Sequence, residues 1–188
     1  YNLKEFLDND PEIDESKLIP NALLRIDENT IVGTKICEEA FALYYNVDMF
    51  KEAGVEPPPT KAEDAWDWDT FVEVCKKLTI DENGNNALSP DFNKDRIKQY
   101  GVRFHRWMWS LFFDSNQTSI VKPDKSGLNL SDPAAAEAVQ KLADLINVHH
   151  VAPTVTSEKN LPAPATAMQS KKVAMNIDGQ WVNVDLAD

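Results

Sequence analysis

The sequence predicts an α/β layered fold, because segments typical of helices and of strands alternate along its 188 residues. Hydrophobic residues make up 43% of the chain, which allows it to bury a substantial core. No segment of about 20–50 residues recurs, which excludes solenoid and propeller architectures. Together these observations indicate one domain, or one domain and part of another.

Short runs rich in β-branched and aromatic residues predict the strands of the sheet. In the last of these runs, alternation places Val173, Met175 and Ile177 on one side of a strand. The pair Asp178-Gly179 follows this run and predicts a turn. The predicted strands are Thr30–Lys35, Ala42–Tyr45, Tyr100–Phe104 and Val173–Ile177.

The helix expected at Val47–Ala53 has sequence signals at both of its ends. Asn46 is a suitable N-cap, and Gly54 suits the position just beyond the last turn. Tyr45 and Phe50 have the spacing of a hydrophobic staple, in which a residue before the cap packs on the first turn. These agreeing signals predict a short, well-defined helix directly after a strand.

Other helices are expected where apolar residues recur every three or four positions. Ser131 is the expected N-cap of the longest, which would run to about His149. Residues 1–29 are expected to be helical too, with Pro20 kinking or beginning their second helix. The apolar stripe of the long helix would consist of Ala135, Val139, Leu142 and Ile146. The other predicted helices are Asp69–Leu78, Trp107–Phe113 and Ala165–Ser170.

Composition excludes several classes of function. The net charge of −12, from 31 acidic and 19 basic residues, repels nucleic acid, and no basic run offsets it. No apolar stretch approaches the ~20 residues that span a bilayer. Cys37 and Cys75 fit no zinc or redox spacing, and a buried thiol is expected for Cys75. We therefore expect no metal and no cofactor. Catalytic motifs are absent as well, so an enzyme would have to rely on a pair of the many carboxylates, as in glycoside hydrolysis.

Five tryptophans form the most informative set of side chains. An aromatic ring can cover the flat C–H face of a sugar while polar groups at the rim bind its hydroxyls. Trp107 and Trp181 each follow a predicted strand, and ligand crevices in open α/β sheets lie beyond the carboxyl ends of strands. On these local grounds a pocket and core packing explain the two residues equally well. Trp68 and Trp109 lie on apolar helices, which favours the core for them.

Three separated segments carry a resemblance to a known family. The first comprises ALYYNVDMFKEAGVEPP and WDWDTFVEVCKKLT, and the second comprises YGVRFHRWMWSLFFDSN and LNLSDPAAAEAVQKLADLI. The third is MQSKKVAMNIDGQWVN. In order and spacing they resemble the extracellular solute-binding proteins of carbohydrate ABC importers, the relatives of maltose-binding protein.

The resemblance implies a periplasmic-binding-protein type II fold, in which two lobes close on a ligand. It implies that residues 1–36 are the end of the first lobe and residues 37–41 the crossover between lobes. Residues 42–188 would then form most of the second lobe, a three-layer α/β/α unit that is incomplete at its C-terminus. The chain is accordingly expected to be an internal fragment of a longer protein.

The resemblance also implies the ligand-binding residues. Glu39 matches a carboxylate that accepts from a sugar hydroxyl, although an exposed loop acid is the alternative. The loop His105-Arg106-Trp107 matches a ligand-contacting loop, but it lacks the Glu-Pro-Tyr of maltose-binding relatives. Maltose specificity is therefore not supported, and Arg106 is compatible with an acidic sugar or a phosphate. Gly179 precedes Trp181, which matches a tryptophan that stacks on sugar.

The expected function is therefore capture of a sugar or oligosaccharide, without catalysis, for delivery to the transmembrane subunits of an ABC permease. The protein would act outside the cytoplasm, as a cell-surface lipoprotein or in a periplasm, and would meet the membrane only through an anchor or its permease. One alternative keeps the fold but binds glycerol phosphate, a polyamine or a peptide. Another is a surface enzyme that processes glycans.

Overall fold

The computed structural model describes residues 1–19, 21–37 and 39–187. They form two compact units, Tyr1–Ala40 (unit 1) and Phe41–Asp188 (unit 2), each of which is described by itself. Within the described ranges, no helix has both the length and the apolar character needed to cross a membrane.

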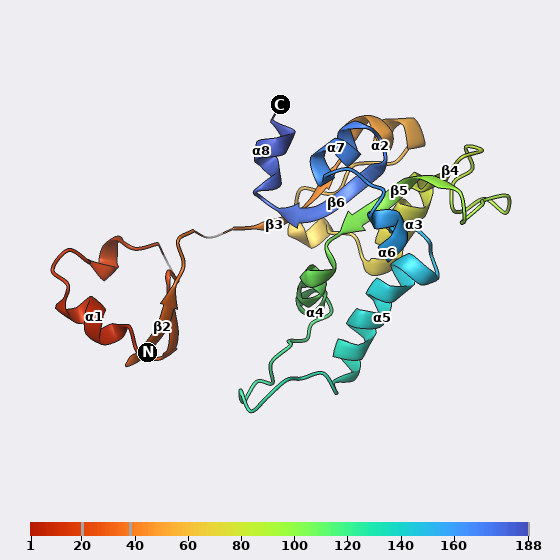
Figure 1. Cartoon of the computed structure of the whole chain (residues 1–188). Helices are drawn as coiled ribbons and strands as arrows, with labels where there is room; N and C mark the ends of the chain where they lie inside the picture. Colours follow the sequence, from red (N-terminus) through yellow and green to blue (C-terminus); the bar gives the residue numbers. More distant parts are fainter. Residues whose placement is uncertain (20, 38, 188) are drawn as a thin grey trace. The chain divides into compact units, whose positions relative to one another are not determined.

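Unit 1 is built around a two-stranded hairpin. Strand β1 (Leu23–Asp27) pairs antiparallel with β2 (Thr30–Thr34), and the Asp27 carboxylate accepts a hydrogen bond from the Asn29 N–H in the turn. Two short elements precede the hairpin: first the helix α1 (Lys4–Asn9) and then the 3-10 turn η1 (Glu15–Lys17) (Figure 1). The predicted strand at Thr30–Lys35 is confirmed.

Residues 1–29 were predicted to be helical, and this prediction is wrong for Leu23–Asp27, which form strand β1. The run Leu-Leu-Arg-Ile has no strong local preference, and pairing with β2 across a tight turn makes it a strand. Pro20, which was expected to begin or kink a helix, lies outside the described residues.

Unit 2 contains a four-stranded mixed sheet in the order β3-β6-β5-β4 (Figure 1). The two central strands, β5 and β6, are parallel. Strand β3 pairs antiparallel with β6, and β4 pairs antiparallel with β5. The bounds of the strands are Phe41–Tyr45 for β3, Ile80–Asp81 for β4, Ile97–Phe104 for β5 and Val173–Gly179 for β6. The three predicted strands of this unit are thus confirmed, but Asp178 and Gly179 end β6 instead of forming a turn.

Helices and short turns surround this sheet. The predicted α/β alternation is confirmed, and one further helical turn, α6, lies between α5 and α7. The helices are α2 (Val47–Ala53), α3 (Trp68–Leu78), α4 (Leu111–Ser115), α5 (Pro133–Asn147), α6 (Val155–Glu158), α7 (Pro164–Gln169) and α8 (Val182–Leu186), with the 3-10 turns η2 (Ala62–Asp64) and η3 (Arg106–Ser110).

The caps of α2 agree with the sequence. The Asn46 side chain accepts from the Met49 N–H, and Gly54 adopts a left-handed conformation with φ of 64°. The rings of Tyr45 and Phe50 lie 5.0 Å apart between centroids, as a hydrophobic staple requires. The local signals therefore predicted this helix and its ends correctly.

The start and the buried stripe of α5 differ from the prediction. Asp132, not Ser131, is the N-cap, because its carboxylate accepts from the Ala134 N–H. Val139 is exposed. Ala135 and Leu142 of the predicted stripe are buried and Ile146 is partly buried, so the prediction fails only at Val139, because the first half of the helix turns Ala138 toward Phe113 while its second half packs on the main core. The buried residues are Ala135, Ala138, Leu142 and Leu145.

Helices cover both faces of the sheet. Val102 of β5 lies beside Met175 of β6, and both belong to a main core that also includes Leu78 of α3. Successive strand residues point to opposite faces. Arg103 is therefore on the other face, where it forms an ion pair with Glu158 of α6. Helix α7 packs against β6.

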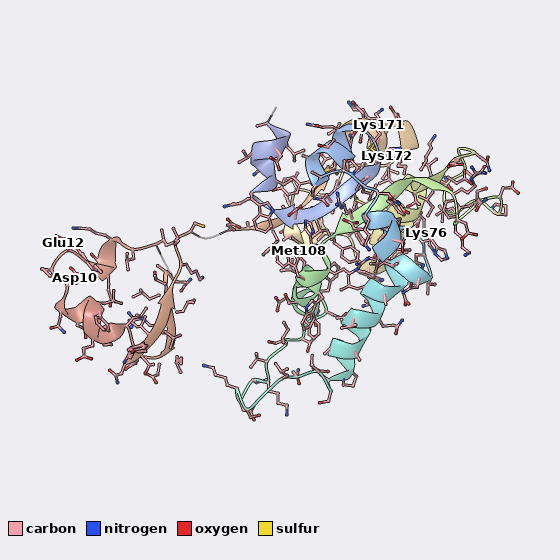
Figure 2. The ribbon with its side chains drawn as sticks, in the orientation of Figure 1. Asp10, Glu12, Lys76, Met108, Lys171 and Lys172 are labelled. Carbon is pink, nitrogen blue, oxygen red and sulfur yellow. The ribbon has the colours of Figure 1, made fainter. Side chains whose placement is uncertain are left out.

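Side chains from connecting segments complete the packing. Met108 in η3 is fully buried, whereas Lys171, after α7, forms an ion pair with Glu52 of α2 at the surface (Figure 2). Cys75 is buried and free, and burial raises the pKa of its thiol well above the ordinary value. The expected buried thiol at this position is confirmed.

The sheet meets α3 at a very close approach. Gly101 donates its N–H to Thr79 Oγ1, and this hydroxyl donates to the Cys75 carbonyl at 2.7 Å. A Cβ at position 101 would lie 2.1 Å from that carbonyl oxygen. Only glycine therefore allows β5 to pass the end of α3.

We predict that Gly101→Ala lowers the free energy of unfolding by about 1–3 kcal/mol, because the added methyl group forces the strand and helix apart. Urea unfolding followed by circular dichroism measures the change. Gly127→Ala is the matched control, because a Cβ there meets nothing within 4 Å. Equal unfolding midpoints for the two variants would contradict this account of the contact.

Candidate functional site

Three chain segments meet at one edge of the sheet of unit 2. Phe104, the last residue of β5, lies beside Ile177 of β6, because the two strands run parallel. Phe41, the first residue of β3, pairs with Gly179 at the end of β6. The residues that follow β5 and β6 are therefore brought close to the start of β3.

Three aromatic side chains gather at this edge, and we call Phe41, Trp107 and Trp181 the aromatic cluster. The Phe41 ring meets Trp107 and Trp181 edge-on, with centroids 5.9 and 5.7 Å apart. The two indoles are roughly parallel, 6.1 Å apart. Trp107 keeps 57% of its surface exposed, Phe41 40% and Trp181 39%. Such exposure is unusual for large aromatic groups in contact with each other, and marks a surface able to cover a flat apolar face of a ligand.

A buried carboxylate supports the cluster from behind. Asp178 is fully buried, and its oxygens accept from the Gly179 N–H and from the Asn176 side-chain amide. His105 Nε2 lies 3.4 Å from Asp178 Oδ2, and the His105 ring stacks on Trp107 with an interplanar angle of 15°. Asp178 therefore orients His105, which in turn supports one face of Trp107.

Gly179 allows Trp181 to fold back over the end of β6. A Cβ at this position would lie 2.1 to 2.4 Å from three carbon atoms of the Trp181 ring. The indole therefore lies directly against the backbone of Gly179. Any larger residue would displace this indole from the cluster.

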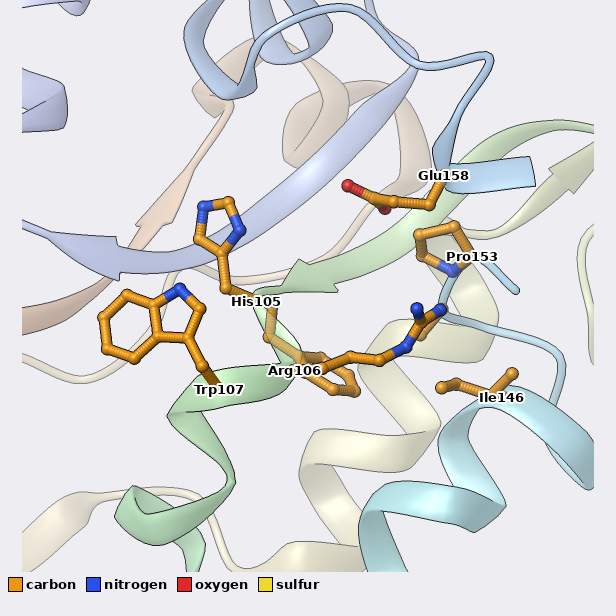
Figure 3. Close-up of a pocket in the computed structure, with 8 residues that line it drawn as sticks. His105, Arg106, Trp107, Ile146, Pro153 and Glu158 are labelled. Atoms are coloured by element: carbon orange, nitrogen blue, oxygen red, sulfur yellow. The ribbon is translucent and has the colours of Figure 1, made fainter. Parts of the chain in front are cut away.

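A small pocket of about 210 Å³ lies beside the cluster (Figure 3). His105, Arg106 and Trp107 line it, and Arg106 extends toward Pro153, away from Trp107. Glu158 also lines this pocket, with its charge offset by Arg103, whose Nε donates to Glu158 Oε1 at 2.9 Å. Within the described part of the chain, Arg106 forms no ion pair, so its guanidinium is available to a polar group in the pocket.

Glu39 belongs to unit 1, and its surroundings are described within that unit. It is exposed, and the Cys37 thiol donates to its carboxylate over 3.8 Å. Its neighbour Glu38, part of the predicted crossover, lies outside the described residues.

The structure brings His105, Arg106, Trp107, Gly179 and Trp181 to the same edge of unit 2. Their role in binding stays a prediction. Sequence reasoning missed Phe41 and Asp178. Phe41 alternates with Leu43 and Tyr45, and this alternation was a signal that it belongs to the strand. Asp178 was missed because an Asp-Gly pair is typical of a turn.

The chemistry of this edge is that of noncovalent recognition. Aromatic faces, a histidine and a free guanidinium offer stacking and hydrogen bonds. Among the residues that the structure describes, no group of three or more His, Cys, Asp or Glu side chains is arranged to hold a metal ion.

Comparison with known proteins identifies relatives of the chain. The sequence model of the bacterial extracellular solute-binding proteins matches residues 3–188. A Brucella abortus protein whose name describes it as a binding protein is 27% identical over 143 residues. That match covers 76% of this chain but 30% of the relative, so the chain spans about a third of its length.

Solved structures share the fold. The ABC substrate-binding protein of Listeria monocytogenes in complex with cycloalternan is 22% identical, with a TM-score of 0.73 over 100% of this chain and 44% of that one. The maltose/maltodextrin-binding domain MalE of Bdellovibrio bacteriovorus bound to maltotriose is 19% identical, with a TM-score of 0.63 over 100% of this chain and 43% of that one. An Agrobacterium radiobacter solute-binding protein in complex with ribitol is 21% identical, with a TM-score of 0.66 over 100% and 44%.

We predict that Gly179→Ala moves the Trp181 indole out of the aromatic cluster, because the new methyl group would overlap the ring. The near-ultraviolet circular dichroism of the coupled tryptophans should weaken, and acrylamide quenching of their fluorescence should rise. Gly127→Ala should change neither signal. A Gly179→Ala spectrum and quenching curve equal to those of the unsubstituted chain would show that this packing is absent in solution.

Proposed function

This chain belongs to the family of bacterial extracellular solute-binding proteins, and from that premise we propose that it captures a sugar or oligosaccharide as part of the binding component of an ABC importer. The family consists of binding proteins that perform no catalysis, so the glycan-processing enzyme considered from the sequence is excluded. The observation that carries the sugar proposal is the exposed aromatic cluster at the strand ends.

The cluster suits a sugar because a pyranose ring is flat and apolar on its C–H face and polar around its edge. Trp107 and Trp181 offer the aromatic faces. His105, fixed by Asp178, and Arg106 offer polar groups beside them for hydroxyl groups. Complexes of structural relatives with cycloalternan and maltotriose support ligands of this chemical class, and the ribitol complex of another relative supports a ligand rich in hydroxyl groups.

The proposal extends to the organisation of the whole protein. We propose that residues 1–36 end a first lobe, residues 37–41 cross between lobes and residues 42–188 form most of a second. The division into units at Ala40 and Phe41 is compatible with this assignment. Glu39 would then add a carboxylate from the crossover to the ligand site. Because the closed state binds ligand better, ligand would shift the lobes toward it. The closed protein would deliver the sugar to its permease outside the cytoplasm.

An anionic ligand is the second candidate, and one observation favours it. Arg106 lines the pocket without an ion pair among the described residues, and a guanidinium can bind a phosphate or carboxylate through two hydrogen bonds. An acidic sugar would satisfy both this group and the aromatic cluster. Glycerol phosphate would use the guanidinium but leave the aromatic faces uncovered, so the sugar proposal accounts for more of the site.

We predict that Trp181→Ala lowers sugar affinity by about 10-fold, because removal of one stacked ring costs roughly 1.4 kcal/mol. A thermal-shift screen against neutral and acidic sugars would first identify the ligand, and calorimetry would then give the dissociation constants. The ligand should raise the unfolding temperature of the unsubstituted chain.

Trp109→Ala is the matched control for this experiment. Trp109 packs edge-on against Phe113 at 5.2 Å and lies outside the cluster, so its loss should leave affinity unchanged. Equal affinities for the Trp181→Ala and Trp109→Ala variants would refute the role of the cluster. A stabilisation by glycerol phosphate but by no sugar would favour the anionic ligand instead.

A further inference from the structure

A second, larger hollow of unit 2 lies next to the aromatic cluster. We call it the groove, and its volume is about 850 Å³. It is bounded by the edge of the sheet, the start of α3, and helices α4 and α5. Ligand sites for small molecules have volumes of about 300–1,000 Å³, so the groove has the size of a binding site, whereas the 210 Å³ pocket beside Arg106 does not.

The wall of the groove is aromatic. Trp68 lies 5.6 Å from Phe71 and 6.4 Å from Phe112 between ring centroids, and Trp66 completes this wall. These rings are partly buried against the main core, which holds them in place while their remaining surface faces the groove. The groove therefore presents rigid aromatic surface of the same kind as the cluster.

Polar groups with fixed positions form the rim of the groove. Lys141 Nζ donates to Asn116 Oδ1 at 2.9 Å and forms an ion pair with Glu137 at 2.9 Å. The same ammonium lies 5.8 Å from the centre of the Trp68 ring. The Asn116 amide donates to the Ala134 carbonyl, so both side chains are oriented before any ligand arrives. Fixed donors and acceptors beside aromatic faces match the alternating hydroxyls and C–H surfaces of a sugar.

Phe41 connects the groove to the cluster. Its side chain lines the groove, and its ring contacts both Trp107 and Trp181. We infer that the groove is a second part of the ligand site, which binds further sugar units of an oligosaccharide whose first unit lies on the aromatic cluster. This inference rests on the proposed function, and it adds that the ligand is a chain of sugars instead of a monosaccharide.

The polar rim argues against an apolar occupant such as a lipid tail. Burying Lys141, Asn116 and the nearby Asp67 carboxylate under hydrocarbon would remove water without replacing its hydrogen bonds. A sugar replaces them with its hydroxyls. Hydrogen bonds from the Thr70 side chain and from the Thr70 N–H lower the pKa of the Asp67 carboxyl, so Asp67 is a charged acceptor at neutral pH.

The test blocks the groove without touching the cluster. Ala65 is exposed and lines the groove, so Ala65→Trp would fill the space beside Trp66. Ala62→Trp is the matched control, because Ala62 is exposed three residues earlier and does not line the groove. Lys141→Gln is a second variant, which removes the rim cation without adding bulk and serves if Ala65→Trp fails to fold.

The probes are gluco- and xylo-oligosaccharides of one to four units, titrated by calorimetry into the chain and its variants. We expect the trisaccharide or tetrasaccharide of the recognised series to bind about 10-fold or more tightly than its monosaccharide. Ala65→Trp should reduce the affinity for the longer sugars to that for the monosaccharide, and Lys141→Gln should reduce it in part. Ala62→Trp should bind like the unsubstituted chain.

Two outcomes would contradict the inference in distinguishable ways. Equal affinities for short and long sugars, unchanged in Ala65→Trp and Lys141→Gln, would refute the groove and leave the proposed function intact if Trp181→Ala still weakens binding. No binding of any sugar in either series would contradict both the groove and the sugar proposal.

Discussion

The parallel pairing of β5 with β6 is the constraint on which the site depends. Parallel strands end at the same edge of a sheet, so the residues after Phe104 and after Gly179 must emerge together. The antiparallel partner β3 begins at this edge and adds Phe41. The sequence separation between Trp107 and Trp181 is therefore unimportant, because the sheet register brings their indoles to 6.1 Å. The close approach at Gly101 keeps β5 against α3.

The site departs from the usual rules for buried groups. Asp178 is a fully buried carboxylate, and the buried Oδ1 of Asn176 has no hydrogen-bond partner among the described residues. Burying a charged group or an unpaired polar atom costs folding free energy unless hydrogen bonds or charges offset it. Buried groups of this kind are concentrated at functional sites. Here Asp178 accepts the Gly179 N–H and faces His105. We interpret this arrangement as the support that keeps His105 and Trp107 in position before a ligand binds.

The parts of the fold that the sequence predicted are those with local signals. The caps of α2 and the strand Val173–Ile177 depend on neighbouring residues, so they were predictable. Strand β1 depends on pairing with β2, and the end of β6 depends on pairing with Phe41, so local reasoning assigned a helix to the first and a turn to the second. The places of Trp107 and Trp181 after strands predicted their position at a sheet edge, although on local grounds a pocket and core packing explained them equally well. Phe41 and the groove require the tertiary fold, because their residues come from distant segments.

In the proposed function, the ligand binds on the aromatic cluster. The most direct measurement is a two-dimensional NMR titration of the ¹⁵N-labelled chain with the sugar selected by screening, in which the five tryptophans give separate indole N–H signals. The Trp107 and Trp181 signals should shift together and saturate at the same sugar concentration, while the Trp109 signal should stay unchanged. Saturable shifts elsewhere in the chain, with the Trp107 and Trp181 signals unmoved, would contradict binding on the cluster.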